Sequence, residues 1–206
     1  MTSPSDPFAL AHWRRTVAAL YADVRKRADD PRAQCEAFRR AKDALFRTHP
    51  QSPIAEHLRT AWPGVRWFPY DAAARVEAAI EPAATRETFD IALASDGVLR
   101  CTQVGSAHFT MAGREASLSM YWLEGYGGGL WLPFADATTG VSTYGGGRYL
   151  YDTIKGADLG VHATSIVLDF NYAYNPSCAY DERWSCPLSP AENRLGLAVE
   201  AGERLG

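Results

Sequence analysis

The chain has 206 residues, of which 47% are apolar and 22% are charged, a composition typical of a folded globular protein. Its net charge of −3 and pI of about 6.0 argue against nucleic acid as a partner, because phosphate binding usually needs a basic surface. No apolar run approaches the roughly 20 residues that span a bilayer. We therefore expect a soluble protein without a membrane partner, and the sequence predicts neither a cofactor nor an oligomeric state.

The N-terminus lacks the basic and apolar regions of a signal peptide, so a cytoplasmic location is expected. Four cysteines are too few for a disulfide scaffold, and that compartment favours free thiols. The length fits one domain over residues 1–206. We divide it into a helical N-terminal segment (1–60), a strand-rich core (62–188) and a C-terminal helix (189–206).

Helices are predicted in the first third of the chain. Apolar residues recur there at spacings of three and four, first at Trp13, Val17, Leu20, Tyr21 and Val24, then at Phe38, Ala41, Leu45 and Phe46. Asp30 suits the N-cap of the second helix, and Pro31 suits its first turn. Ser52-Pro53 would begin a short third helix through Leu58 by the same logic.

Strands are predicted from Thr88 onward, where the apolar period is about two. The candidates are Thr88–Ala94, Leu99–Val104, Ala107–Ala112, Ala116–Leu123, Leu130–Phe134, Arg148–Tyr151 and Ser165–Asn171. Turn residues separate them, including Gly105-Ser106 and the hairpin at Ala112–Glu115. The pattern predicts an α+β fold built on an antiparallel β-barrel or sandwich.

A helix is also predicted at the C-terminus. Ser189-Pro190-Ala191-Glu192 matches a capping box, in which Glu192 reaches back to the backbone of Ser189. Leu195 and Val199 would form the buried stripe of this helix. Asn193 has no evident role in such a cap.

Three stretches of the sequence resemble one family. The longest reads Leu-Asp-Phe-Asn-Tyr-Ala-Tyr-Asn-Pro-Ser-Cys-Ala-Tyr from Leu168 and continues through Cys186-Pro187 to Glu192-Asn193. The others are Phe134–Gly140 with Thr143-Tyr144 and Gly147–Leu150, and Phe38–Phe46 with Ser52-Pro53 and Trp67–Pro69. Together with Ala201–Glu203, they resemble the bacterial and archaeal domain-of-unknown-function family 1684 over most of the chain. The resemblance implies no particular activity.

Charged residues in two predicted strands suggest an anion site. Arg148 follows three glycines, which let a backbone approach a ligand, and its guanidinium could clamp a carboxylate or phosphate. Asp169 and Asn171 would share one face of a strand. A buried Asp169 would need a partner, for which Arg148 is the natural choice. The alternative for Arg148 is a structural ion pair with Asp136 or Asp169.

The segment from Tyr172 to Tyr180 is irregular and aromatic. Tyr174, Asn175 and Tyr180 combine hydrogen-bonding groups with apolar bodies, a common lining for a small-molecule pocket. Together with Arg148, Asn171 and Tyr144 they are our predicted ligand-binding residues. The alternative is a long loop that aromatic side chains pin to the sheet.

Cys178 and Cys186, with seven residues between them, allow three interpretations. They could bind a metal, although the spacing is poor and His108 or His162 would have to be recruited. One of them could be a catalytic nucleophile beside a base or a positive charge. They could also simply pack together or form a disulfide that tethers the loop.

We therefore expect a small-molecule-binding barrel, which would be an enzyme if Asp169 or Cys178 acts as a catalytic residue on a bound anionic or polar metabolite. Two alternatives stay open. One is a non-catalytic structural or interaction domain. The other is a thiol-based redox or metal protein that uses Cys178 and Cys186.

Overall fold

The computed structural model describes residues 6–93 and 97–205, and it begins with two long helices. These are α1 (Pro7–Arg25) and α2 (Pro31–Thr48). Asp30 caps α2 as predicted, because its carboxylate accepts a hydrogen bond of 3.0 Å from the Ala33 amide. The predicted third helix is wrong in extent, since the chain forms only a 3₁₀ turn there, η1 (Glu56–Leu58).

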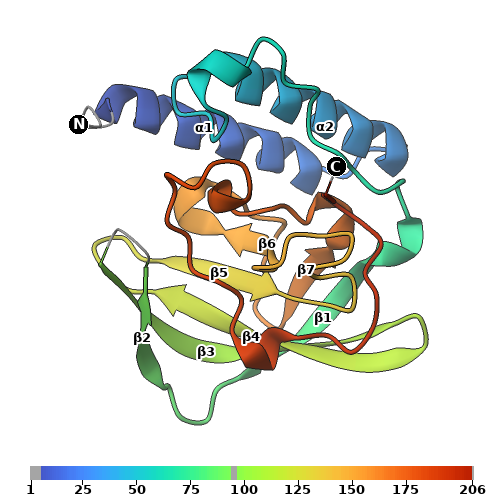
Figure 1. Ribbon diagram of the computed structural model, residues 1–206. Coiled ribbons are helices and arrows are strands. Elements are labelled where there is room, and N and C mark those ends of the chain that lie inside the picture. The colour runs from blue at the N-terminus through green and yellow to red at the C-terminus, as the bar shows by residue number, and fades with distance from the viewer. Residues whose placement is uncertain (1–5, 94–96, 206) are drawn as a thin grey trace.

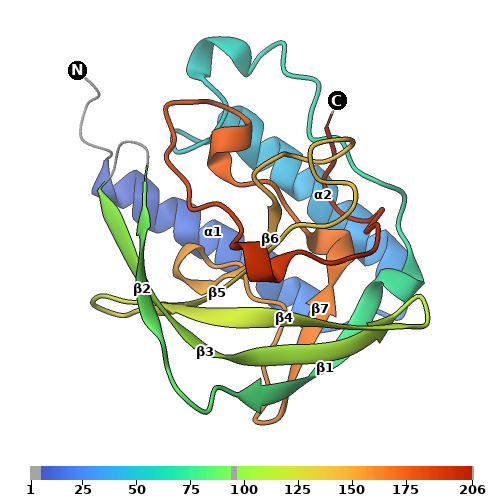
Figure 2. The same cartoon turned by 60° about the horizontal axis from the view of Figure 1, so that its bottom comes forward.

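Within the described residues, seven strands form one antiparallel sheet in the order β6-β5-β4-β3-β1-β7, and β2 pairs with β3 beside this path. Their bounds are β1 (Arg75–Pro82), β2 (Thr88–Ala92), β3 (Val98–Met111), β4 (Arg114–Leu123), β5 (Gly129–Phe134), β6 (Arg148–Asp152) and β7 (Ser165–Asp169). The sheet curls into a half-barrel, and α1 and α2 lie side by side over one side of it (Figures 1 and 2). The α+β class and the barrel-like antiparallel sheet are thus confirmed.

The hairpin predicted at Ala112–Glu115 is confirmed as the turn between β3 and β4. Met111 pairs with Arg114, so Ala112 and Gly113 form the two-residue loop, with φ of 50° and 72°. Two consecutive residues with positive φ match the twist of the strands that they join.

The predicted turn at Gly105-Ser106 is wrong, because β3 runs through it as one strand of 14 residues. The register with β4 shifts between Gln103 and Gly105, so the glycine marks an irregularity rather than a turn. A Cβ atom at Gly105 would lie 2.6 Å from the carbonyl oxygen of Glu81. Glycine is therefore required there by the close approach of β1, a strand that the sequence analysis did not predict.

The predicted C-terminal helix is also wrong. Only a 3₁₀ turn forms, η6 (Ala191–Asn193), and Ser189 provides no side-chain cap to it. The carboxylate of Glu192 instead accepts a hydrogen bond of 2.8 Å from the Tyr121 hydroxyl on β4. Beyond η6 the chain returns to end near α2 (Figure 1).

Asn193 explains why this segment is held on the sheet rather than coiled. Its side-chain amide donates to the carbonyl oxygens of Ser119 and Pro133, at 2.9 and 2.7 Å. Its side-chain oxygen accepts from the Ser119 amide at 2.8 Å. The backbone N–H of Ala135 then donates to the Asn193 carbonyl oxygen, and the Ala135 carbonyl oxygen accepts from the Leu195 amide, so the segment adds to the edge of the half-barrel.

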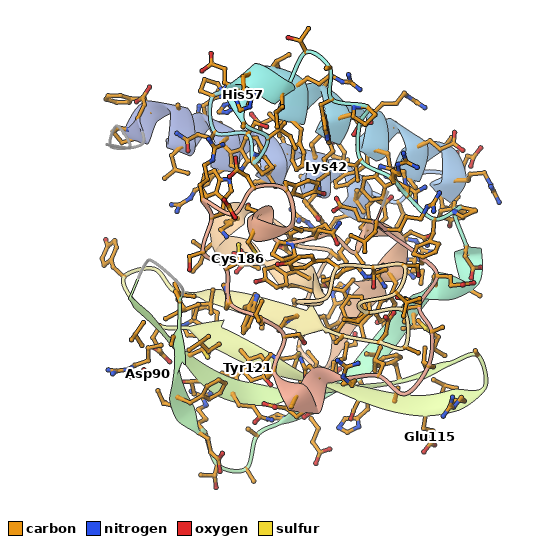
Figure 3. All side chains as sticks on the ribbon, in the orientation of Figure 1. Lys42, His57, Asp90, Glu115, Tyr121 and Cys186 are labelled. Carbon is orange, nitrogen blue, oxygen red and sulfur yellow. The ribbon has the colours of Figure 1, made fainter. Side chains whose placement is uncertain are left out.

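The core fills the space between the helix pair and the curled sheet (Figure 3). Tyr21 of α1 packs edge-on against Phe38 of α2, and Phe38 packs edge-on against Tyr172 after β7. The aromatic side chains therefore join helices and sheet in one continuous core. Among the described residues, no helix is both long and apolar enough to cross a membrane.

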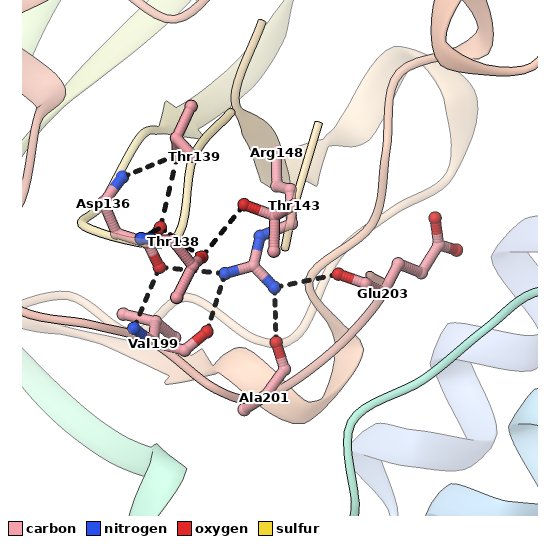
Figure 4. Close-up of polar contacts among 8 residues, drawn as sticks. All are labelled: Asp136, Thr138, Thr139, Thr143, Arg148, Val199, Ala201 and Glu203. Atoms are coloured by element: carbon pink, nitrogen blue, oxygen red, sulfur yellow. Dashed lines mark hydrogen bonds and ion pairs between the residues drawn. The ribbon is translucent and has the colours of Figure 1, made fainter. Parts of the chain in front are cut away.

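Arg148 of β6 holds the last residues of the chain (Figure 4). Its side chain is 1% exposed, and one guanidinium nitrogen donates to the carboxylate of Asp136 at 3.0 Å. The guanidinium also donates to three backbone carbonyl oxygens of the C-terminal segment, those of Val199, Ala201 and Glu203. Because Asp136 also accepts from the Val199 amide at 2.9 Å, the ion pair fixes this segment from both sides.

We predict that Arg148→Met lowers the free energy of unfolding by about 3–5 kcal/mol, because it leaves a buried carboxylate and three buried carbonyl groups without their donor. Urea denaturation followed by circular dichroism measures the change. Arg100→Met is the matched control, since Arg100 pairs with Asp90 through largely exposed side chains and its loss should be far smaller. Equal losses for the two variants would contradict the role assigned to Arg148.

Candidate functional site

A cavity of about 80 Å³ lies between the two helices and the segment that follows β7. Its apolar lining comes from the facing sides of α1 and α2, namely Trp13, Val17, Leu20, Phe38, Leu45 and Phe46. Its polar lining includes Lys42 of α2 and three of the residues predicted to bind a ligand, Tyr174, Asn175 and Tyr180. The structure thus brings these three predicted residues together.

A buried ion pair lies at this cavity. The Lys42 ammonium is 2.5 Å from Oε1 of Glu203, and their side chains are 11% and 0% exposed. The other carboxylate oxygen of Glu203 accepts from the Asn175 amide at 2.7 Å and from the Tyr180 hydroxyl at 2.5 Å. Both carboxylate oxygens of Glu203 therefore have hydrogen-bond partners, which is the condition under which a buried carboxylate is tolerated.

Aromatic rings surround the Lys42 ammonium. Its nitrogen lies 4.8 Å from the ring centre of Tyr174, 5.2 Å from that of Phe46 and 5.7 Å from that of Trp67. Rings at these distances stabilise a desolvated cation through their π faces. The ammonium has three donors, and within the described part of the chain it donates one hydrogen bond, to Glu203. Lys42 therefore has donor capacity to offer a ligand.

Two buried polar atoms of the lining residues have no hydrogen-bond partner in the protein. They are the hydroxyl oxygen of Tyr174 and the side-chain oxygen of Asn175. Burying a polar group without a partner costs free energy, so such atoms usually bond to water or to a ligand. Both atoms belong to residues that line the cavity.

Burial raises the pKa of both cavity tyrosines. For Tyr174 and Tyr180, desolvation is the main cause, and the negative charge of Glu203 adds to it. Both phenols therefore stay protonated at physiological pH and can act as hydrogen-bond donors.

A second group of predicted residues lies on the loop beside the cavity. Cys178, in η5 (Ser177–Ala179), donates its backbone N–H to the sulfur of Cys186 at 3.4 Å, and its own sulfur accepts from the Tyr144 hydroxyl at 3.5 Å. Both thiols are free and half-buried. Hydrogen bonds to its sulfur, first from Cys186 and then from Tyr144, lower the pKa of Cys178 to about 6. The metal alternative finds no support, because no three His, Cys, Asp or Glu side chains among the described residues are grouped to hold an ion.

Asp169 and Asn171 lie elsewhere, at a cleft of about 510 Å³ beside the turn between α1 and α2, which Asp169 and Arg75 both line. Asp169 accepts from the Asn171 backbone and side-chain amides at 3.1 and 2.9 Å. The predicted pair of Asp169 with Arg148 is wrong, since the cation near Asp169 is Arg75 at 3.9 Å. Asn171 does not share a strand face with Asp169 either, because β7 ends at Asp169 and η4 (Phe170–Tyr172) follows.

The predicted site residues are therefore divided among four places. Tyr174, Asn175 and Tyr180 share the cavity, Cys178 and Tyr144 lie beside it, and Asp169 and Asn171 line or border the cleft. Arg148 is enclosed in the network with Asp136, where both terminal guanidinium nitrogens bond to protein atoms.

The ion pair of Lys42, which lines the cavity, with Glu203 was not predicted from the sequence. Lys42 lies in a run of basic residues that reads as a solvated helix face, and Glu203 lies in a segment predicted to be helical. One signal was available, because Lys42 falls on the same helical stripe as Phe38 and Phe46, at spacings of four.

The fold and the site define a class, an antiparallel half-barrel covered by two helices, with a buried ion pair at a cavity beneath them. The chain matches the family model described as protein of unknown function (DUF1684) over residues 60–204, and it belongs to that family. No curated protein matches the sequence.

A solved structure is also similar. It is the solution NMR structure of an uncharacterized protein from gene locus rrnAC0354 of Haloarcula marismortui. The two sequences are 36% identical over 84% of this chain and 93% of that one, and the TM-score is 0.60. The family and this neighbour support the fold and leave the activity to be argued from the site.

We predict that Asp169→Asn changes the pH dependence of stability. Burial raises the pKa of Asp169 above its ordinary value, and the hydrogen bonds from Asn171 offset this only in part. The folded protein thus holds this proton more tightly than the unfolded chain. The wild-type protein should lose stability relative to the variant as the pH rises through the ordinary and then the raised pKa. Urea denaturation from pH 3.5 to 7 measures this, and parallel curves would contradict it.

Proposed function

We propose that the protein binds a small polar or anionic molecule in the cavity between α1, α2 and the segment from Tyr174 to Tyr180. The observation that carries this proposal is the pair of buried, unpartnered oxygen atoms on Tyr174 and Asn175 at the same cavity as a buried ammonium. A cavity that served only to close the core would be expected to have an apolar lining.

The donors and acceptors of the cavity describe the ligand. Lys42 offers N–H groups to an oxygen acceptor, and a carboxylate or phosphate oxygen suits an ammonium best. The Asn175 oxygen only accepts, so the ligand needs a hydroxyl or amine group that donates to it. The Tyr174 hydroxyl can donate or accept. A hydroxy acid or an amino acid carries both kinds of group close together.

Size and lining add a second criterion. A volume of about 80 Å³ admits the polar end of a small molecule and not a whole cofactor, since pockets for drug-sized ligands measure about 300–1,000 Å³. Trp13, Leu20 and Leu45 line the same cavity and are half-buried. They would pack against a short apolar body that follows the polar end.

Whether this site also performs a reaction depends on a catalytic group near the bound molecule. Of the two predicted catalytic residues, Cys178 is the one next to the cavity in the sequence, because the preceding residue, Ser177, lines the cavity. Asp169 is not among the lining residues. The rival function is a non-catalytic structural or interaction domain, in which Lys42 and Glu203 only clamp α2 to the C-terminal segment.

A ligand screen with small carboxylic acids tests the proposal. Hydroxy acids, amino acids and simple carboxylates are added to the protein, and binding is measured by saturation-transfer NMR and by the rise in melting temperature. We expect binding by members that carry both an oxyanion and a donor group. No binding by any of them, with the protein folded, would favour the structural rival.

We predict that Tyr174→Phe weakens the affinity for such a ligand about five- to tenfold, because the variant loses one hydrogen bond worth about 1 kcal/mol. The protein itself should lose no stability, since the Tyr174 hydroxyl has no partner within it. Tyr121→Phe is the control, because its hydroxyl bonds to Glu192 away from the cavity. Calorimetric titration measures both affinities, and equal values for the two variants would contradict the prediction.

A further inference from the structure

The loop that follows the cavity residues places two cysteines against each other. The backbone N–H of Cys178 donates to the sulfur of Cys186, 3.4 Å away. Because the donating N–H belongs to Cys178 itself, this contact also places the Cys178 and Cys186 sulfur atoms close to each other. Both cysteines are reduced and half-buried, whereas Cys35 and Cys101 are fully buried.

The surroundings of Cys178 suit an attacking thiolate, and those of Cys186 suit its partner. The Tyr144 hydroxyl donates to the Cys178 sulfur. The positive charge of Lys155 lowers the pKa of both thiols and so does not distinguish them. The pKa of Cys186 is raised instead, mainly because its thiol donates its proton to Cys178. One activated thiol beside one protonated thiol is the arrangement that thiol–disulfide exchange requires.

We propose that Cys178 and Cys186 form a thiol–disulfide exchange site, with Cys178 as the nucleophile and Cys186 as the resolving thiol, for small disulfides. The Cys178 thiolate attacks one sulfur of the disulfide, a mixed disulfide forms, and one thiolate leaves. Cys186 then gives its proton to that leaving thiolate and attacks the Cys178 sulfur, which releases the second thiolate. The second thiolate takes a proton from water, which replaces the proton that Cys178 gave to water when it ionised. The protein loses two hydrogens and the small disulfide is reduced to two thiols. This proposal stands independently of the ligand proposed for the cavity.

The disulfide would close a loop that is already anchored at both ends. Tyr180 is hydrogen-bonded to Glu203 on one side, and the Tyr149 hydroxyl donates to the Pro187 carbonyl oxygen on the other. These anchors keep the two cysteines together in the reduced protein. The bond can therefore form without bringing distant segments together, which favours rapid exchange.

Glutathione disulfide is the probe for the exchange. After incubation at pH 7 and acid quenching, intact-mass spectrometry should show wild-type protein that has lost two hydrogens, and peptide mapping should join Cys178 to Cys186. Cys186→Ser should accumulate glutathione on Cys178, because the resolving thiol is absent. Cys178→Ser should trap at least about tenfold less glutathione, because burial still raises the pKa of the remaining Cys186 thiol.

Alkylation by iodoacetamide tests the role of Tyr144. The rate at Cys178 should level off above about pH 7 in wild-type protein, and in Tyr144→Phe the midpoint should move to higher pH. Cys101→Ala is the control that leaves both readouts unchanged, since this thiol is fully buried on β3. The proposal is overturned if wild-type protein keeps both thiols while its unfolded form reacts, or if the two serine variants trap glutathione equally.

Discussion

The pairing of Arg148 with Asp136 is the interaction on which the other features of this structure depend. A guanidinium removed from water needs a carboxylate and further acceptors, and the carbonyl groups of Val199, Ala201 and Glu203 complete its set. The segment that contributes them is thereby fixed across the end of the half-barrel. Glu203 can then extend its side chain towards α2, where Lys42 meets it. A charged network built for stability thus positions the carboxylate of the candidate site.

Residues of the cavity and of the dithiol alternate along one segment, and their side chains point to different neighbours. Tyr174, Asn175 and Tyr180 turn towards the helices, while Cys178 turns towards Tyr144 and Cys186. The cavity residues and Cys178 share the same support, namely the hydrogen bond from Tyr180 to Glu203. Oxidation of the pair would therefore restrain the loop that lines the cavity, even though the chemistry of the two sites is separate.

Several features were predictable because they depend on residues near each other in the sequence. The cap at Asp30 and Pro31, the stripe of α2 and the turn at Ala112-Gly113 each involve a few consecutive residues. Strand β1 was not predicted. Val76, Ala78 and Ile80 do alternate there with Glu77 and Glu81, but alanine has a low strand propensity and weakens this alternating pattern. Three of the ligand-binding candidates were found because tyrosine and asparagine crowd into one irregular segment.

Distant contacts decided the rest. The capping box at Ser189 is a valid local signal, yet Asn193 gains three hydrogen bonds from β4 and β5, and the end of the chain stays extended. Lys42 could be placed on a helix from its spacing, but its partner lies 161 residues away. The sequence by itself determined the two long helices, most of the strands, the family and the segment in which polar and aromatic residues gather. Only the tertiary structure decided which charges pair, because a buried charge takes whichever partner the fold brings within reach.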